Sequence, residues 1–478
     1  MTKNSTRQIR TRVAPSPTGN IHIGTARAAL FPWLFARHNE GVLVLRIEDT
    51  DKERSRKEFE NSIIEGLRWL GITWDEFYRT SDRTQIYTKY IKRLLENGKA
   101  FWCYHTKEEL EEESTSQLTN KEIPRHVCEF KKYASEGKKF KTSYTSGVIR
   151  LAVNENSDRV IEFNDLIRGL VRTQERLLGD ISIARDEEDA LYHFQVVVDD
   201  YEMDITHIIR GEDHISNTPK HILIQEALGF PIPEYAHLPL VVDEQRKKLS
   251  KRDGAMSIDD FRQRGYLPEA VLNFIALLGF TPKEDTMIAS PEELIKLFDI
   301  HRIHKSSAIY DEKKLDFING EYIKKMSVEQ FIEYITPELS RNIPSFDLQI
   351  LKKASPMLQE RFHNFSDIKE FNYLFNNPEY GKDVLIWKEA SQEDTFYRLS
   401  VIYDAFKDFS DWSSKEAIKA NLESKVEELA LGRGPLYWPF RVALSGQKAS
   451  PDPIDLAYVL GRDSVLSRLK IALGKLKS

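Results

Sequence analysis

Cysteine is almost absent from this sequence, because the 478 residues include only Cys103 and Cys128. So few thiols exclude the disulfide framework that stabilises many secreted proteins. Long apolar runs are lacking as well: none approaches the ~20 residues of a membrane-spanning helix, and the N-terminal segment has no apolar stretch typical of a signal peptide. We therefore expect a cytoplasmic protein that makes no membrane contact.

An excess of charge of one sign is lacking too. The chain has 69 Lys and Arg against 75 Asp and Glu, a net charge of −6. This balance excludes a chain that is basic throughout, although it is compatible with local positive surfaces. Lys and Arg outnumber Asp and Glu from residue 411 onward. A chain of this length, with no internal repeat, predicts roughly two to four globular domains.

Strand-like and helical patterns alternate in the first part of the chain. The β-rich runs IRTRVA (9–14) and VLVLRIE (42–48) are each followed by helical periodicity, at 25–37 and 58–71. This alternation predicts βαβ units and a parallel, nucleotide-binding sheet.

The pattern then changes twice. Charge runs with weak periodicity from 107 to 150 indicate an insertion, after which strand-like texture returns in YHFQVVVDD (192–200) and DITHIIRGED (204–213). Beyond KKLSKRDG (247–254) the periodicity is mostly helical, and the C-terminal third predicts an all-α region. We expect a sheet that is interrupted by an insertion and followed by helices.

Two loops carry candidate chemistry. The prolines and glycines of APSPTGNIHIGT (14–25) indicate either an ordinary turn with Thr25 as a helix cap, or a loop that brings phosphates to a helix N-terminus. By itself, KKLSKRDG is typical of a solvated loop. If both loops flank one ATP, His22, Lys248 and Lys251 supply donors where charge accumulates on a transferring phosphate.

Six sequence blocks follow one another along the chain: RVAPSPTGNIHIGTARAAL, LRIEDTDKERS, VVVDDYEMDITHIIRGEDHISNTPKH, YAHLPLV, KKLSKRDGAMSI and GYLPEAVLNFIALLGF. Together they resemble a class I aminoacyl-tRNA synthetase, specifically the glutamyl-tRNA synthetase family of the bacterial and organellar type. HIG at 22–24 corresponds to the start of the class signature HIGH, with Thr25 in the fourth place. KLSKR at 248–252 corresponds to KMSKS. The resemblance covers nearly the whole chain.

This resemblance implies an α/β fold with a split, Rossmann-like parallel sheet, an inserted acceptor-binding module and an all-α C-terminal anticodon-binding region. The expected domains are a catalytic nucleotide-binding domain at 1–87 and 186–227, the acceptor-end module at 88–185, a stem-contact region with the KLSKR loop at 228–320, and helical anticodon-binding domains at 321–478.

The resemblance also implies ATP-dependent ligation of L-glutamate to tRNA(Glu) by a monomer. The glutamate α-carboxylate attacks the α-phosphate of ATP to give glutamyl-adenylate and pyrophosphate, and the 2′-hydroxyl of the 3′-terminal adenosine then takes the acyl group. Mg²⁺ is expected to arrive with ATP. Whether tRNA(Gln) is also charged stays open.

The site residues of the family carry over to this chain position by position. Those expected to bind ATP are His22, Gly24, Asp213, Lys248, Lys251 and Arg252, of which His22, Lys248 and Lys251 are expected to be catalytic. Those expected to bind glutamate are Arg12, Tyr192 and Arg210 at the carboxylates, with Ser16 and Glu48 at the amino group. Arg361 is the expected anticodon contact.

The residues themselves favour part of this assignment. Arg12, Glu48 and Arg210 each stand at the end of a predicted strand, and the carboxyl ends of parallel strands are where an open α/β sheet binds ligands. Guanidinium forks fit carboxylates bidentately. For Tyr192 a core aromatic is a serious alternative.

Other interpretations remain open. The carboxylates of EDTD (48–51) suit Mg²⁺, but Asp49 or Thr50 as a helix cap is the simpler interpretation, and we assign no protein ligand to the metal. A glutaminyl-tRNA synthetase would have a β-barrel anticodon domain, and a glutamyl-queuosine transferase would end near the catalytic core. A silent tRNA-binding paralogue would not need both signatures, and a small-molecule nucleotidyltransferase would not need the long helical region.

The two cysteines suggest a structural zinc site. Some members of the family bind zinc in the insertion through a Cys-x-Cys pair and a later Cys-x-His pair, and Cys103 and Cys128 stand at the leading position of each. Here His105 replaces the second cysteine, Phe130 occupies the histidine place, and His126 precedes Cys128. Cys103, His105, His126 and Cys128 would form an N₂S₂ set that suits tetrahedral zinc. Two inert buried thiols are the alternative.

Overall fold

The computed structural model describes residues 8–51, 53–136, 147–247, 256–283 and 286–477. The chain divides into two compact units, which we call the catalytic unit (Met1–Arg262 and Pro268–Leu315) and the helical unit (Gln263–Leu267 and Asp316–Ser478). Among the described residues, no helix has the length and apolar character needed to cross a membrane.

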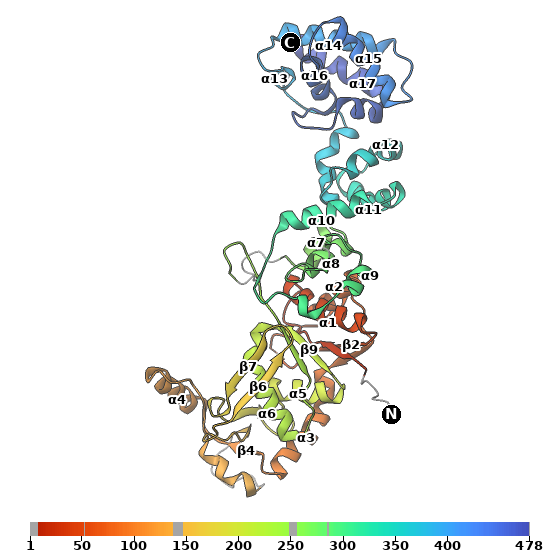
Figure 1. The fold of residues 1–478 in the computed structure, drawn as a ribbon. Coiled ribbons are helices and arrows are strands. Elements are labelled where there is room, and N and C mark those ends of the chain that lie inside the picture. The colour runs from red at the N-terminus through yellow and green to blue at the C-terminus, as the bar shows by residue number, and fades with distance from the viewer. Residues whose placement is uncertain (1–7, 52, 137–146, 248–255, 284–285, 478) are drawn as a thin grey trace. The chain divides into compact units, whose positions relative to one another are not determined.

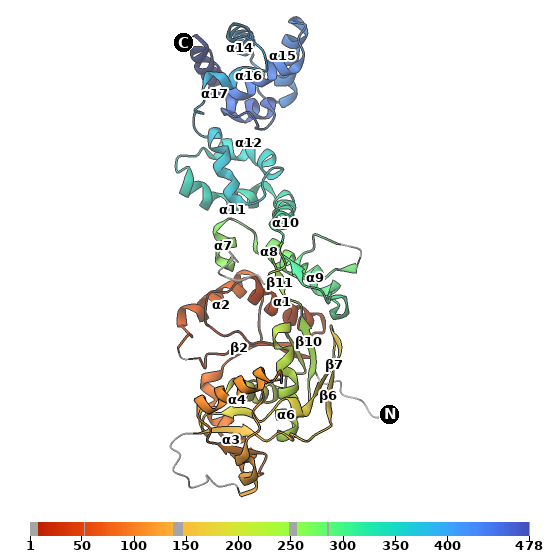
Figure 2. The ribbon, with the colours of Figure 1, turned by 90° about the vertical axis from the view of Figure 1, so that its left-hand side faces the viewer.

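Parallel strands form the centre of the catalytic unit. One sheet has the order β1-β2-β3 and the other has the order β7-β6-β10-β9; all neighbours are parallel except β6 and β7, and β10 runs beside β6 and β7 in Figure 2. The strands are β1 Arg10–Val13, β2 Val42–Ile47, β3 Glu76–Arg79, β6 Val160–Asp165, β7 Gly169–Gln174, β9 His207–Gly211 and β10 Glu234–Leu238. The strands of these two sheets come from all four predicted segments of the first 320 residues. β1, β2 and β3 lie in 1–87, β6 and β7 in 88–185, β9 in 186–227 and β10 in 228–320.

The two sheets meet at β1 and β9. Thr206, just before β9, donates its backbone N–H to the carbonyl of Arg10 at 2.9 Å. The parallel strands therefore follow the order β3-β2-β1-β9-β10, which is the 3-2-1-4-5 order of a doubly wound sheet. In such a sheet ligands bind beyond the carboxyl ends of the strands at which the order reverses, here β1 and β9.

Helices and two smaller sheets complete the catalytic unit (Figure 1). The helices are α1 Ile23–His38, α2 Lys57–Trp69, α3 Thr84–Glu96, α4 Lys107–Thr119, α5 Tyr192–Glu202, α6 Thr218–Leu228, α7 Ile258–Gln263, α8 Pro268–Ala276 and α9 Pro291–Leu297. An antiparallel sheet consists of β4 Ala100–Cys103, β5 Val148–Leu151 and β8 Ile181–Ala184, and a parallel pair consists of β11 Val241–Val242 and β12 Ala308–Ile309.

The strand predicted at 192–200 is wrong, because α5 occupies this segment. All residues from Phe194 to Asp200 are buried. The valine run is therefore apolar because core surrounds this helix on every side, a situation that periodicity alone does not distinguish from a buried strand. The strand predicted at 204–213 is confirmed as β9.

The helix cap predicted at Asp49 or Thr50 is also wrong. Helix α2 begins at Lys57, after Arg56. Asp49 instead accepts hydrogen bonds from the backbone N–H and the hydroxyl of Ser81, at 2.9 and 2.7 Å. Its carboxylate ties the loop after β2 to the segment after β3.

The helical unit confirms the predicted all-α region. Its helices, drawn from green to blue in Figure 1, are α10 Glu312–Lys324, α11 Val328–Asn342, α12 Leu348–Gln359, α13 Lys382–Leu385, α14 Gln392–Lys407, α15 Lys415–Glu428, α16 Arg433–Ser445 and α17 Pro453–Lys477. Serine capping boxes begin α11 and α14, where Ser327 and Ser391 each accept a backbone N–H of the first turn. Apolar faces close the core, for example at Leu399, Phe406 and Phe440, all fully buried.

A buried charge network joins β2 to α5. The fully buried Arg46 lies 2.8 Å from Asp200 through Nη1, 3.2 Å from Glu48 through Nη2 and 3.8 Å from Asp199 through Nε. Burial raises the pKa of Glu48 and of Asp199, and the Arg46 charge opposes that rise. Arg46 thus lies among three carboxylates that have little contact with water. Two further arginines share their charge: Arg83 lies 2.6 Å from Asp199 and Arg12 lies 3.2 Å from Asp200.

Replacing Arg46 by Met leaves the buried Glu48 without its ion-pair partner, and leaves Asp199 and Asp200 with one cation each, Arg83 and Arg12. We expect Arg46→Met to lower the free energy of unfolding of the catalytic unit by about 3–5 kcal/mol at pH 7. The difference in unfolding free energy between wild type and variant becomes smaller toward acidic pH. The pKa values of the buried carboxyls are raised further in the variant, and a carboxyl that has taken up a proton no longer needs a cation. Urea unfolding of the full chain, with hydrogen exchange at the β1 and β2 amides, measures this difference.

The matched control is Arg172→Met on β7, where the Arg172–Glu162 ion pair of 2.7 Å is largely exposed. A surface pair of this kind contributes about 0–1 kcal/mol. Equal losses in the two variants would contradict the role given to Arg46.

Candidate active site

A cavity of about 600 Å³ opens beyond the carboxyl ends of β1 and β9. Its lining includes seven of the residues predicted from the sequence, namely Arg12, His22, Gly24, Glu48, Tyr192, Arg210 and Asp213. Ser16 lies on the exposed side of the β1–α1 loop and is not among the lining residues. The cavity therefore occupies the place where a doubly wound sheet binds its ligand.

His22 caps the N-terminus of α1 at one wall of the cavity. Its Nδ1 accepts the backbone N–H groups of Gly24 at 3.1 Å and Thr25 at 3.4 Å. Because Nδ1 is an acceptor, the ring proton lies on Nε2, which is 3.3 Å from the hydroxyl of Thr25. The helix end thus presents a neutral imidazole with a defined N–H, where the macrodipole favours an anionic ligand.

Gly24 is required by the close approach of this ring. A Cβ atom on Gly24 would lie 2.9 Å from Cε1 and 3.1 Å from Nδ1 of His22. A side chain here would displace the imidazole from the helix end.

Arg12 and Glu48 lie at the ends of neighbouring strands. Arg12 is 4% exposed, and its Nε donates to Asp200 at 3.2 Å. Among the described residues Asp200 is the only hydrogen-bond partner of the Arg12 side chain, so both terminal nitrogens of its guanidinium are available to a ligand. Glu48, held by Arg46, places a carboxylate on the same cavity wall.

Tyr192 and Arg210 also line the cavity. Tyr192 is 36% exposed, and its hydroxyl is 3.3 Å from His214 Nδ1, so the core-aromatic alternative for Tyr192 is not supported. Arg210 is 6% exposed, and burial, followed by the charge of Arg12, lowers its pKa. A pair of buried guanidinium groups in one cavity favours a ligand with more than one carboxylate.

The predicted residues Lys248, Lys251 and Arg252 lie outside the described residues. The described residues next to them are close to His22: Ser257 forms a β-bridge with His22, and Ile258 donates its N–H to the carbonyl of Ile21 at 3.0 Å. The segment that follows the KLSKR motif therefore begins at the wall that His22 forms.

Arg27 is a lining residue that the sequence analysis missed. Its guanidinium donates to the carbonyls of Leu278 at 2.7 Å and Pro239 at 2.6 Å, and burial lowers its pKa to about 10. Arg27 stands in the HIGTAR block, but an arginine on an apolar helix face gives no signal that it reaches across to two later loops.

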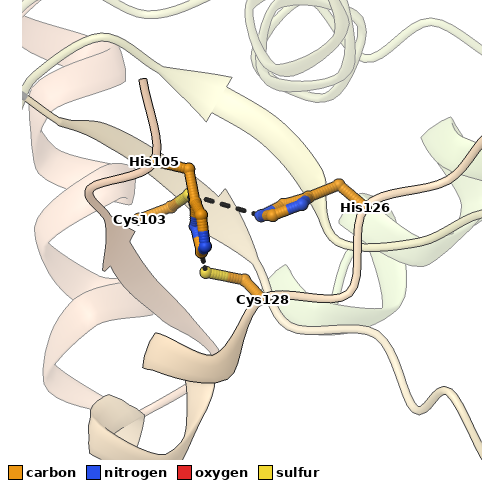
Figure 3. Close-up of side chains that lie close together, drawn as sticks. All are labelled: Cys103, His105, His126 and Cys128. Carbon is orange, nitrogen blue, oxygen red and sulfur yellow. Dashed lines mark hydrogen bonds between the residues drawn. The ribbon is translucent and has the colours of Figure 1, made fainter. Parts of the chain in front are cut away.

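The four predicted metal ligands lie together in the insertion (Figure 3). Cys103 Sγ is 3.5 Å from both His105 Nδ1 and His126 Nε2, and Cys128 Sγ is 3.6 Å from His105 Nδ1. A tetrahedral zinc ion with Zn–S of about 2.3 Å and Zn–N of about 2.0–2.1 Å has S···N edges of about 3.6 Å. Both thiols are buried, and the spacing fits zinc.

The partner of His126 supports the same interpretation. Glu113 Oε2 lies 2.6 Å from His126 Nδ1, which leaves Nε2 free to act as a ligand. Carboxylates commonly orient metal-binding histidines in this way. The hydrogen bond from Cys128, the largest cause, lowers the pKa of the Cys103 thiol, which favours the thiolate that metals bind.

Arg361 lies far along the chain from these groups, in the turn after α12 of the helical unit, and its side chain is exposed. Its backbone N–H donates to the carbonyl of Leu358 at 2.9 Å.

Comparisons with known proteins decide the family. Residues 8–317 match the catalytic domain of class I tRNA synthetases (E and Q), and residues 328–473 match an anticodon binding domain. The chain is 41% identical to the glutamate–tRNA ligase of Aquifex aeolicus, over 98% of this chain and 99% of that protein. The chain belongs to the glutamate–tRNA ligase family. The family prediction and the predicted fold class are thereby confirmed.

Further members of the glutamate–tRNA ligase family agree. The chain is 38% identical to the enzyme of Natranaerobius thermophilus, over 99% of this chain and 100% of that protein. A crystal structure of a glutamate tRNA ligase from Elizabethkingia meningosepticum in complex with its amino acid superposes with a TM-score of 0.88 at 32% identity, and the match covers 98% of this chain and 100% of that chain.

The contact between Gly24 and His22 gives a direct test of this wall. We expect Gly24→Ala to lower kcat/KM by about 10- to 100-fold, because the new Cβ displaces the ring from its reactive position. Folding stability changes little, since the preference of a helix for Ala over Gly, about 1 kcal/mol, offsets the loss of the His22 cap, which is of similar size. Gly474→Ala in α17, where a Cβ meets nothing within 4 Å, is the control. A Gly24→Ala protein with unchanged kinetics would remove His22 from the site.

Proposed function

We propose that this chain attaches L-glutamate to tRNA(Glu) in two steps within the cavity between β1 and β9. The α-carboxylate of glutamate attacks the α-phosphate of ATP, forming glutamyl-adenylate and releasing pyrophosphate. The 2′-hydroxyl of the 3′-terminal adenosine then takes the glutamyl group. The observation that carries this proposal is the pair of buried arginines, Arg12 and Arg210, in one cavity with the His22-capped end of α1.

In this proposal the β-strand ends hold glutamate. Arg12, Tyr192 and Arg210 bind its carboxylates, and Glu48 accepts from its ammonium group together with Ser16. The burial of both arginines strengthens their attraction for the two carboxylates of glutamate, one on its side chain and one on its α-carbon. The assignment of Ser16 requires the loop after β1 to bring this residue to the ligand, because it lies outside the cavity lining.

ATP occupies the side of the cavity next to α1. His22 donates from Nε2 to a phosphate oxygen, Gly24 allows the close approach, and Asp213 at the end of β9 accepts from the ribose. Lys248, Lys251 and Arg252 supply positive charge to the α-phosphate and to the leaving pyrophosphate. Mg²⁺ accompanies ATP. The enzyme contributes positioning and electrostatic stabilisation, with no covalent enzyme intermediate.

The remaining parts of the chain bind tRNA in this proposal. The segment 88–185 holds the acceptor end, 228–320 contacts the stem, and the helical region 321–478 reads the anticodon, with Arg361 as one base contact. Exposure of Arg361 supports a contact of this kind. Assays with purified tRNA(Glu) and tRNA(Gln) decide whether both are charged.

The Cys/His cluster holds a structural zinc ion in this proposal. Cys103, His105, His126 and Cys128 are the four ligands, and the ion joins the end of β4 to the 126–128 segment. Four protein ligands fill a tetrahedral site, so the zinc has a structural role and takes no part in the reaction.

Charging of tRNA(Glu) with radiolabelled glutamate tests the function, and Lys251→Ala tests its electrostatic basis. If Lys251 stabilises charge that develops only in the transition state, the variant loses about 10²–10³ in kcat. Affinity for tRNA stays near that of the wild type. Adenylate formation at the wild-type rate in this variant would remove Lys251 from the mechanism.

Metal analysis tests the zinc proposal. We expect protein purified without chelators to contain about one zinc ion per chain, and Cys128→Ser to lose it because a four-ligand site needs every thiolate. Val127→Ala, on an exposed side chain between two ligands, is the matched control and keeps the metal. Less than stoichiometric zinc, with no further loss in Cys128→Ser, would leave two inert thiols.

A further inference from the structure

Neutral atoms surround the guanidinium group of Arg210. Nε donates to His237 Nε2 at 3.1 Å, and Nη1 lies 3.3 Å from His221 Nδ1. Nη2 donates to the hydroxyl of Thr218 at 2.8 Å and to the carbonyl of His214 at 3.3 Å. These contacts fix the plane of the guanidinium without neutralising it.

The other buried arginines of the network differ in this respect. Arg46 and Arg12 both form ion pairs with Asp200, at 2.8 and 3.2 Å. Among the described residues, no carboxylate lies within ion-pair distance of Arg210. A buried cation without a counter-ion is costly, and an anionic ligand that supplies the missing charge recovers that cost on binding.

His237, at the end of β10, lies between Arg210 and the carboxylate of Asp165, and its ring hydrogen-bonds to both of them. Its Nδ1 lies 2.6 Å from Asp165 Oδ2, and both side chains are buried. Because the Asp165 carboxylate is an acceptor, the ring proton lies on Nδ1, and Nε2 is left as an acceptor for Arg210. The opposite tautomer would aim an N–H at the N–H of Arg210.

Asp165 is itself held in place. Its Oδ1 accepts backbone N–H groups from Ile167 at 3.0 Å and Arg168 at 2.7 Å. Hydrogen bonds from His237 and from these backbone groups lower the pKa of Asp165 against the effect of its burial, so it is an anion at neutral pH.

We propose that Asp165 and His237 are positioning residues for substrate selection, which hold Arg210 in place through a neutral imidazole so that its charge is left for a carboxylate of the amino-acid substrate. This inference rests on the proposed function, in which Arg210 binds glutamate. It explains selection of a carboxylate over an amide of the same shape. An amide ligand can accept a hydrogen bond from Arg210 but cannot neutralise its buried charge.

Two substitutions of His237 separate its hydrogen bond to Asp165 from the one to Arg210. Its Nε2 also lies 3.2 Å from the hydroxyl of Thr218. In His237→Gln, the amide oxygen can take the place of Nε2 and still accept from Arg210. In His237→Asn, the shorter amide reaches Asp165 but not Arg210. Asp165→Asn is the third variant: its carboxamide keeps the acceptor for the backbone but donates to Nδ1, which forces His237 into the tautomer that opposes Arg210.

Steady-state charging of tRNA(Glu) at saturating ATP gives the readout. We expect His237→Asn and Asp165→Asn to raise KM for glutamate by about 10- to 100-fold, because each removes an acceptor from a charged donor. The values of kcat and KM for ATP stay near wild type, the inhibition constant of glutamine rises less than KM for glutamate does, and His237→Gln restores most of the affinity. His207→Asn, a histidine of β9 outside the cavity lining, is the matched control.

Three results would overturn the inference: an unchanged KM for glutamate in His237→Asn, equal impairment in His237→Gln and His237→Asn, or parallel weakening of glutamate, glutamine and ATP. Failure of the wild-type chain to charge tRNA with glutamate would instead refute the proposed function. The tautomer of His237 tests the arrangement independently of catalysis. Its ¹⁵N shifts are expected to place the proton on Nδ1 in the wild type and on Nε2 in Asp165→Asn.

Discussion

Burial of positive charge on three adjacent strands is the constraint on which the active site depends. Arg46 on β2, Arg12 on β1 and Arg210 on β9 are all nearly inaccessible to water. Arg46 forms ion pairs with three carboxylates, Arg12 shares one of these, and among the described residues Arg210 has neutral hydrogen-bond partners only. Charge compensation thus decreases across the sheet toward the point where the strand order reverses. In the proposed function, an anionic ligand supplies the missing negative charge beside Arg210.

The need for donors that are fixed in place explains why these arginines are buried. The catalytic cavity needs donors whose positions do not depend on water, since charge that develops during reaction is best stabilised by groups already in place. Arg46 holds Asp200, and Asp200 in turn orients Arg12. The His22 ring, also in the cavity lining, is oriented by the first turn of α1. These side chains of the cavity lining are therefore held in place by contacts to helices and strands of the fold.

Much of this arrangement could be predicted from the sequence, because the relevant residues lie in short contiguous blocks. Arg12, His22 and Gly24 fall within one strand–loop–helix unit, and Arg210 stands at a recognisable strand end. The wrong strand at 192–200 shows the limit of periodicity, since a helix with core on every side has no polar face. The roles of Asp165 and His237 could not be predicted, because 72 residues separate them. His237 stands in the YAHLPLV block, but nothing in that block points to Asp165 as its partner.

The Cys/His cluster shows a different limit. The sequence places Cys103, His105, His126 and Cys128 in two short pairs, and chain geometry brings these pairs together. Glu113, which orients His126, lies on a charged helix among other glutamates, where no pattern distinguishes it. Sequence patterns identify ligands by type and spacing, whereas orienting partners become visible only in three dimensions.

The central claim is that Arg210 is an uncompensated cation reserved for a substrate carboxylate. A crystal structure of the full chain with L-glutamate and a non-hydrolysable ATP analogue tests this claim most directly. The account predicts a glutamate carboxylate within hydrogen-bond distance of Arg210, with Nε of that arginine still donating to His237 and the second carboxylate close to Arg12. Glutamate bound with both carboxylates away from Arg210, or Arg210 paired with a carboxylate of the protein, would contradict it.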